Sequence, residues 1–177
     1  ALLPSGQTLS DTQRLDFEQF VARHAHWLDD YALFIALQEH FSGQPWSLWS
    51  GPLRYRDAQA LSQFSEQAAE RLNELKIEQF LLDCRWQQVR REAHLRGIQI
   101  LGDVPISVAY DSVEVWAHPE LFKLDEQLRP TVVAGVPPDY FSETGQLWGN
   151  PHYQWALMQD DQFSWWRARI ANVLRQV

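Results

Sequence analysis

Gly97-Ile98-Gln99-Ile100-Leu101-Gly102-Asp103 combines a helix-ending glycine, a short apolar run and an acid. Upstream of it, apolar residues from Ile77 to Cys84 have the i, i+3, i+4, i+7 spacing of a helix, which we expect to continue to about Leu95. Gly97 suits the C-terminal cap of that helix, and residues 98–101 predict a buried strand. Helix, glycine and strand together make one αβ unit.

Asp103 directly follows the predicted strand. In α/β barrels the catalytic and binding groups lie at the C-terminal ends of strands, so Asp103 is a candidate site residue. An aspartate at such a position also caps turns, and the residues alone leave these two roles open.

Further elements are expected on both sides of this unit. We predict helices over about 15–26, from Asp29 or Asp30 to Phe41, over about 58–72, and from Phe163 onward, with Trp27 and Leu28 interrupting the first two. Two short strands are expected at 122–124 and 131–134. Residues 135–151 hold three Pro and three Gly, which predicts an irregular and functional loop.

Composition excludes several classes of function. A net charge of -8 argues against a nucleic-acid partner, and no apolar run approaches the roughly 20 residues that span a bilayer. Residues 1–13 lack the pattern of a signal peptide, and the single Cys84 forms no internal disulfide, so we expect a cytoplasmic protein. The six histidines are scattered and no nucleotide-binding motif or serine elbow occurs, so no metal and no cofactor is expected.

Aromatic residues are frequent, with nine Trp, nine Phe and five Tyr. Two interpretations remain open for them: a core rich in large rings, or a surface that stacks on flat ligands such as sugars. Carboxylates beside aromatic residues, among them Asp103, Asp139 and Trp148, favour a sugar site, since glycoside chemistry uses carboxylic acids and rings hold the sugar chain.

Two motifs carry a resemblance to a known family. One runs from Gly102 to Ser112 and continues in Val115-Trp116; the other is the loop from Pro137 to Pro151. Both resemble the amylomaltase, or disproportionating enzyme, family of 4-α-glucanotransferases, which is related to the α-amylases. Asp30-Tyr31-Ala32-Leu33-Phe34 and Gly43-Gln44-Pro45-Trp46 match upstream segments of the family, so the resemblance covers about Phe17 to the end.

The resemblance implies an α/β fold, part of a (β/α)8 TIM-type barrel with helical insertions and truncated before the strand that carries the nucleophile. It divides this single incomplete domain into 1–96, a helical insertion region, and 97–177, a barrel segment with strand, active-site loop and following helix. Such a part of a barrel is expected to expose apolar surface, to self-associate or to pair with the rest of the barrel.

The resemblance also implies a function. Family members pass α-1,4-glucan segments between maltooligosaccharides by a retaining double displacement, so α-1,4-glucans are the expected partners. By this resemblance Asp103 faces the sugar at the cleavage point, and Asp139, Tyr140 and Phe141 fold over the donor. Gln146 and Trp148 are expected to touch the acceptor-side sugar, and Gly145 and Gly149 to let the loop turn tightly.

The sequence departs from the family pattern in one respect. The Arg-x-Asp-His-Phe pattern of the family nucleophile does not occur, so we expect no catalytic residue in this chain and place nucleophile and acid/base downstream of Val177. Two alternatives to a glucanotransferase fragment remain: a non-catalytic glucan-binding module, and a helical interaction domain with an ordinary aromatic core.

Overall fold

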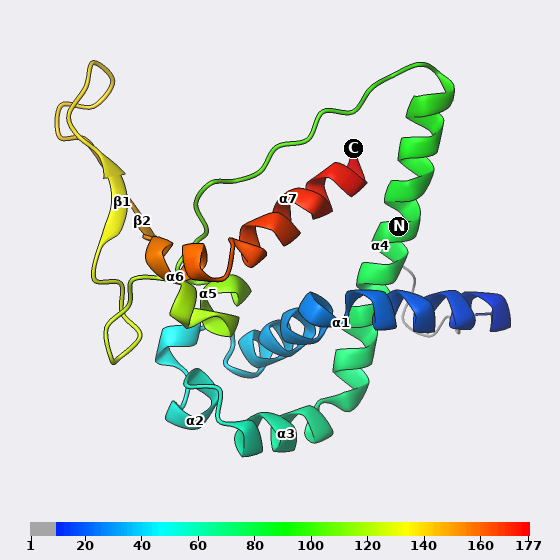
Figure 1. Ribbon diagram of the computed structural model, residues 1–177. Helices are drawn as coiled ribbons and strands as arrows, with labels where there is room; N and C mark the ends of the chain where they lie inside the picture. The colour runs from blue at the N-terminus through cyan, green and yellow to red at the C-terminus, as the bar shows by residue number, and fades with distance from the viewer. Residues whose placement is uncertain (1–9) are drawn as a thin grey trace.

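The computed structural model describes residues 10–177, so residues 1–9 of the stretch inspected for a signal peptide lie outside the described residues. Helices dominate, and one β-hairpin projects from them (Figure 1). In chain order the elements are α1 (Asp11–His40), η1 (Trp46–Leu48), α2 (Gly51–Arg54), α3 (Ala58–Gln67), α4 (Ala69–Leu95), α5 (Val113–Ala117), η2 (Pro119–Leu121), β1 (Val133–Val136), β2 (Gln146–Pro151), α6 (Trp155–Asp160) and α7 (Ser164–Gln176).

The long first helix contradicts the predicted interruption at Trp27 and Leu28. α1 is continuous from its capping box at Ser10 to Phe41. Leu28 is fully buried in a small cluster with Phe20 of α1 and Phe80 of α4. Burial of Leu28 against a helix about 50 residues away stabilises the helical backbone at this position, which a local pattern does not reveal.

The helices predicted at 58–72 and from Ile77 to Leu95 divide at a different residue than expected. α3 ends at Gln67 and α4 already begins at Ala69, so the helix expected to reach Leu72 stops five residues earlier. The turn at Ala68 allows Phe64 of α3 and Leu75 of α4 to bury their side chains in the same core. The predicted end of α4 is confirmed: Gly97 has φ +68°, and the amides of Gly97 and Ile98 bond back to the carbonyls of His94 and Ala93.

The predicted buried strand at 98–101 is wrong. This part of the connecting segment 97–112 has no strand assignment, and Leu101 is 93% exposed. A strand requires a hydrogen-bonded neighbour, and none of the described residues provides one. The segment instead lies against α7, where a Cβ on Gly102 would come within 2.7–2.8 Å of methyl carbons of Val177 and Val173.

The loop predicted to be irregular is in large part a hairpin. β2 pairs antiparallel with β1, with Val136 opposite Gln146 and Val133 opposite Pro151. Gly145 and Gly149 have φ of +74° and +78°, which confirms that both glycines permit tight turns. Of the two strands expected upstream, 131–134 overlaps β1, whereas Phe122 and Leu124 form only isolated bridges.

The main core joins both parts of the chain. Its buried rings come from α1, the η1 region and α5, and from Phe122 and Tyr153 near the hairpin; they include Phe34, Trp46, Trp49 and Trp116. Some tryptophans therefore belong to the core, whereas Trp148 and Trp155 are exposed and could stack on a flat ligand. The predicted final helix is confirmed as α7, although its apolar residues Ile170 and Leu174 are exposed. Exposed apolar surface, as expected, is also present on α4 and the connecting segment.

Candidate functional site

The tip of the hairpin presents two aromatic rings to solvent. Tyr140 and Phe141 are 95% and 89% exposed, and their rings meet edge to face at 5.6 Å. Asp139 holds the turn that carries them, because its Oδ1 accepts hydrogen bonds from the backbone amides of Phe141 (2.9 Å) and Ser142 (2.8 Å). In this structure Asp139 therefore orders the tip through its side chain, while both rings remain free to contact a ligand.

Gln146 and Trp148 lie together on β2. Residues two apart on a strand share a face, and here the indole Nε1 of Trp148 donates to Oε1 of Gln146 over 3.0 Å. Trp148 is 55% exposed. The pair thus combines one flat apolar surface with an amide, a combination suited to the faces and hydroxyls of a sugar.

A bulge in β2 sets the direction of these side chains. Val133 of β1 pairs with Pro151 of β2, whereas Gly135 pairs with Leu147. A step of two residues along β1 therefore corresponds to a step of four along β2. Gly149, with its positive φ, lies in this bulge next to Trp148 and Asn150. Bulges re-aim side chains beside functional sites, and this one allows Asn150 to reach away from the hairpin.

Asp103 stands apart from the other five candidate residues. It is exposed on the connecting segment 97–112, and no hydrogen bond joins it to the hairpin among the described residues. The structure therefore brings together Asp139, Tyr140, Phe141, Gln146 and Trp148 on one hairpin and leaves Asp103 on a neighbouring segment.

Two residues that sequence reasoning missed join that segment to the base of the hairpin. Asn150 Nδ2 donates to the Val108 carbonyl, and the Tyr153 hydroxyl donates to the Ile106 carbonyl, each over 2.7 Å. Burial raises the pKa of Tyr153, which keeps its hydroxyl protonated as a donor at neutral pH. The position of Asn150 after a glycine in a Pro- and Gly-rich stretch was the available signal for a bulge.

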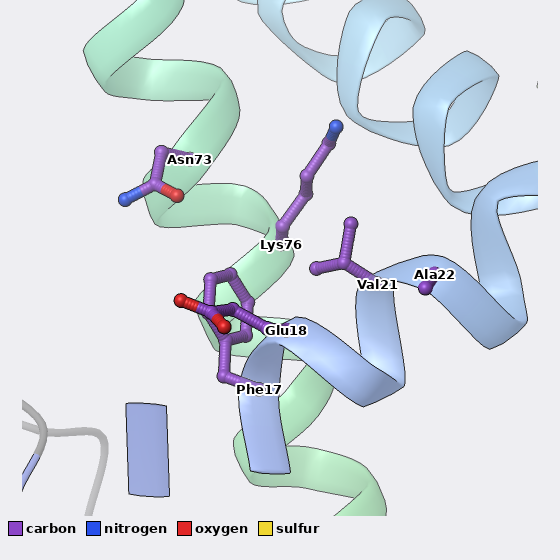
Figure 2. Close-up of a pocket in the computed structure, with 6 residues that line it drawn as sticks. All are labelled: Phe17, Glu18, Val21, Ala22, Asn73 and Lys76. Atoms are coloured by element: carbon purple, nitrogen blue, oxygen red, sulfur yellow. The ribbon is translucent and has the colours of Figure 1, made fainter. Parts of the chain in front are cut away.

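A concave region lies far from the hairpin, between α1 and α4. It is an open groove of about 320 Å³ lined by Phe17, Glu18, Val21 and Ala22 of α1 and by Asn73 and Lys76 of α4 (Figure 2). Lys76 forms an ion pair with Asp29, so the cation already has a partner. None of the candidate sugar-binding residues lines this groove. In the described part of the chain, no group of three or more His, Cys, Asp or Glu side chains is arranged to hold a metal ion.

Residues 3–177 match the model of the family described as 4-alpha-glucanotransferase, glycoside hydrolase family 77. The chain belongs to this family. Curated members similar to it include a 4-alpha-glucanotransferase of Thermus thermophilus, 50% identical over 93% of this chain, and a chloroplastic or amyloplastic 4-alpha-glucanotransferase of Arabidopsis thaliana, 44% identical over 81% of it.

A solved structure of the family has the same fold over this region. Amylomaltase from Streptococcus agalactiae, in complex with acarbose, superposes with a TM-score of 0.89 at 36% identity over 94% of this chain. The chain spans a quarter to a third of the length of these relatives: 33% of the Thermus thermophilus protein, 25% of the Arabidopsis protein and 34% of the amylomaltase. No helix of the described residues of this family member is long and apolar enough to cross a membrane.

Proposed function

We propose that this chain forms the substrate-binding part of a 4-α-glucanotransferase that passes α-1,4-glucan segments between maltooligosaccharides. The observation that carries the proposal is the hairpin of a family member with three exposed rings, Tyr140, Phe141 and Trp148, held by hydrogen bonds at its tip and base. Acarbose in the similar amylomaltase supports a sugar-like ligand for this family.

Each candidate residue has a separate role in this proposal. Asp103 contacts the sugar at the cleaved bond, and Asp139, Tyr140 and Phe141 cover the donor glucan. Gln146 and Trp148 contact the acceptor-side sugar, with the indole face against a glucose ring and the amide against a hydroxyl. Ring stacking and a hydrogen-bonding amide together provide both affinity and orientation.

The chemistry is proposed to be a retaining double displacement. A carboxylate attacks the anomeric carbon while a carboxylic acid protonates the leaving 4-oxygen; the 4-hydroxyl of a second glucan then attacks the glycosyl-enzyme and returns its proton to the acid/base residue. No Arg-x-Asp-His-Phe sequence occurs in these 177 residues, so we place both catalytic carboxylates downstream of Val177 in a family-length protein.

The exposed apolar residues support a further part of the proposal. Leu95, Ile98 and Leu101 lie at and beyond the end of α4, and more than half of the surface of each is exposed. We propose that they pack against the remaining strands and helices of a (β/α)8 barrel, with 1–96 as the helical insertion region and 97–177 as the barrel segment. We expect the isolated chain to self-associate through this surface. We also propose that the protein is cytoplasmic and that it needs no cofactor.

Maltotriose provides a direct test. A family-length protein carrying these residues is expected to convert maltotriose into glucose and longer oligosaccharides, whereas the 177-residue chain alone is expected to produce neither, because covalent catalysis requires the nucleophile. Sustained transfer by the purified 177-residue chain would contradict the placement of the carboxylates. Glucan binding without transfer by the family-length protein would instead favour the non-catalytic binding module.

A further inference from the structure

The connecting segment 97–112 is held in place by side chains rather than by backbone pairing. From 99 to 109, no amide or carbonyl bonds to another backbone group among the described residues. Five carbonyls between 105 and 110 accept hydrogen bonds from side chains over 2.6–2.9 Å: Pro105 from Arg169, Ile106 from Tyr153, Val108 from Asn150, Ala109 from Ser112 and Tyr110 from Trp46. The Tyr110 carbonyl also accepts from the Ser112 amide.

All of these donors except Ser112 come from other parts of the fold. Trp46 belongs to η1, Asn150 to β2, and Arg169 to α7, while Tyr153 lies between β2 and α6. Since the segment has no ladder of its own, its path depends on which side chains reach it. Apart from the packing of Gly102 against Val173 and Val177, the nearest restraints on Asp103 are the side-chain hydrogen bonds downstream, at the carbonyls of Pro105, Ile106 and Val108.

Two of the donors lie close in sequence to Trp148 of the candidate sugar site. Asn150 is next to Gly149 in the β2 bulge that also contains Trp148, and Tyr153 follows two residues after the end of β2. Tyr153 is itself buried among Phe122, Trp165 and Trp166, so its hydroxyl is presented from a rigid ring cluster. The hydrogen bonds to Ile106 and Val108 thus transmit the position of the hairpin base to the segment that carries Asp103.

We propose that Asn150 and Tyr153 are positioning residues that set Asp103 in register with Trp148 and the hairpin. The inference rests on the proposed glucanotransferase function for its catalytic consequence, but not for its geometry. Neither residue needs to touch the glucan. Each acts by holding a carbonyl near Asp103, and a displacement of about 1 Å at such a group can cost roughly 100-fold in rate.

The variants are chosen so that the ring packing survives. Tyr153→Phe removes only the hydroxyl that bonds Ile106, and Asn150→Ala removes the amide that bonds Val108. Tyr31→Phe is the matched control, because it also removes a single hydroxyl that takes part in a long-range hydrogen bond, here accepted from the Gln79 side chain over 3.1 Å between α1 and α4 and not made to the connecting segment.

The geometry is measured in a family-length protein with spin labels at two exposed polar positions, Gln99→Cys on the connecting segment and Glu143→Cys near the hairpin tip, in a Cys84→Ser background. A narrow interlabel distance distribution is expected for the parent protein and for Tyr31→Phe, and a broader or shifted one for Tyr153→Phe and Asn150→Ala. An unchanged distribution in both test variants would overturn the positioning role, whether or not the protein transfers glucans.

The catalytic consequence is measured as kcat and KM for maltotriose in the same unlabelled variants, at a temperature where each is folded. We expect kcat to fall roughly tenfold or more and KM to change by less than about threefold, because orientation rather than contact is lost. Unchanged kcat beside an altered distance would refute the coupling between position and rate. A parent protein without transfer would refute the proposed function, while the spin-label distances would still decide whether Asn150 and Tyr153 hold the segment.

Discussion

The indole Nε1 of Trp46 donates a hydrogen bond of 2.7 Å to the carbonyl oxygen of Tyr110, across 64 residues of chain. The backbone amide of Trp46 also donates to the Asp111 carboxylate, and the Trp46 ring is fully buried. Trp46 therefore links the helical first half of the chain to the segment that leads to the hairpin through both its backbone and its side chain.

Trp46→Phe is expected to lower the free energy of unfolding by about 2 kcal/mol or more. The smaller ring leaves a cavity, and the Tyr110 carbonyl loses its side-chain donor. Urea unfolding measures the change. Trp86→Phe is the control, because the Trp86 indole also donates to a carbonyl, that of Gln176, but at an exposed position, and a loss below about 1 kcal/mol is expected there. Equal losses in both variants would contradict the special role of Trp46.

Gly145→Ala is expected to open the hairpin. Gly145 has φ +74°, and a Cβ at this position would come within 2.5 Å of the Val136 carbonyl oxygen. The left-handed backbone alone costs alanine about 1–2 kcal/mol, and the steric contact adds to this cost. Amide exchange of the residues paired between β1 and β2 should accelerate by about 30-fold or more.

Gly97→Ala serves as its control. Gly97 has φ +68°, but no described atom lies within 4 Å of the place that an added methyl group would take, so only the backbone strain of about 1 kcal/mol is expected, at the end of α4. Hairpin amides should exchange as in the parent chain. Accelerated exchange in Gly97→Ala, or none in Gly145→Ala, would show that the steric contact at Val136 does not determine hairpin stability.

How far the sequence predicted the fold depended on the range of the interactions involved. The end of α4 was predictable because Gly97 and its bonds to Ala93 and His94 are local. The continuity of α1 through Leu28 was not, because its burial partner Phe80 lies on α4. The strand at 98–101 was predicted from an apolar run, but an apolar run forms a strand only with a neighbour to pair with.

The candidate site shows the same division. Five hairpin residues and Asp103 were predicted through motifs that resemble a family; the family is shown, and the roles of the six residues stay predictions. Asn150 and Tyr153 were missed because their hydrogen bonds to Val108 and Ile106 span 42 and 47 residues. β2 was missed because Gly149 lies in a bulge, and glycines and prolines indicate loops unless the pairing strand is known.

Two histidines are expected to make the stability depend on pH in opposite directions. Burial lowers the pKa of His24, whose Nδ1 must be unprotonated to accept the hydrogen bond from Trp27. The neighbouring Glu120 carboxylate raises the pKa of His118. Below the unfolded value of about 6.5 the neutral His24 therefore loses its contribution, whereas the contribution of His118 is fully present below that value and is lost as pH rises through its folded pKa.

The measurement is urea unfolding of His24→Gln and His118→Gln at about pH 5.5 and about pH 8. His24→Gln should cost more at the higher pH and His118→Gln more at the lower, each by less than about 1 kcal/mol because both groups are partly solvated. Each variant is the control for the other, since a general effect of pH shifts both in the same direction. Parallel shifts would contradict the assigned environments.

Trp148→Ala in a family-length protein is expected to impair glucan transfer while leaving the fold intact. The ring is 55% exposed, and its indole bonds only the neighbouring Gln146 side chain, so little packing is lost. Contact of the ring with a glucose unit is worth on the order of 1–2 kcal/mol, which corresponds to roughly tenfold or more in rate if the contact is made in the transition state.

Leu147→Ala is the matched control for this last change. Leu147 is adjacent on β2, points to the opposite face of the strand and is also exposed, so neither the melting temperature nor the transfer rate should change much. Melting temperature and transfer rate are measured for both variants. A buried Trp→Ala change would cost about 3–5 kcal/mol of stability instead. If Trp148→Ala melts far lower while its folded fraction keeps full transfer activity, Trp148 is a packing residue and its assignment to the acceptor side is wrong.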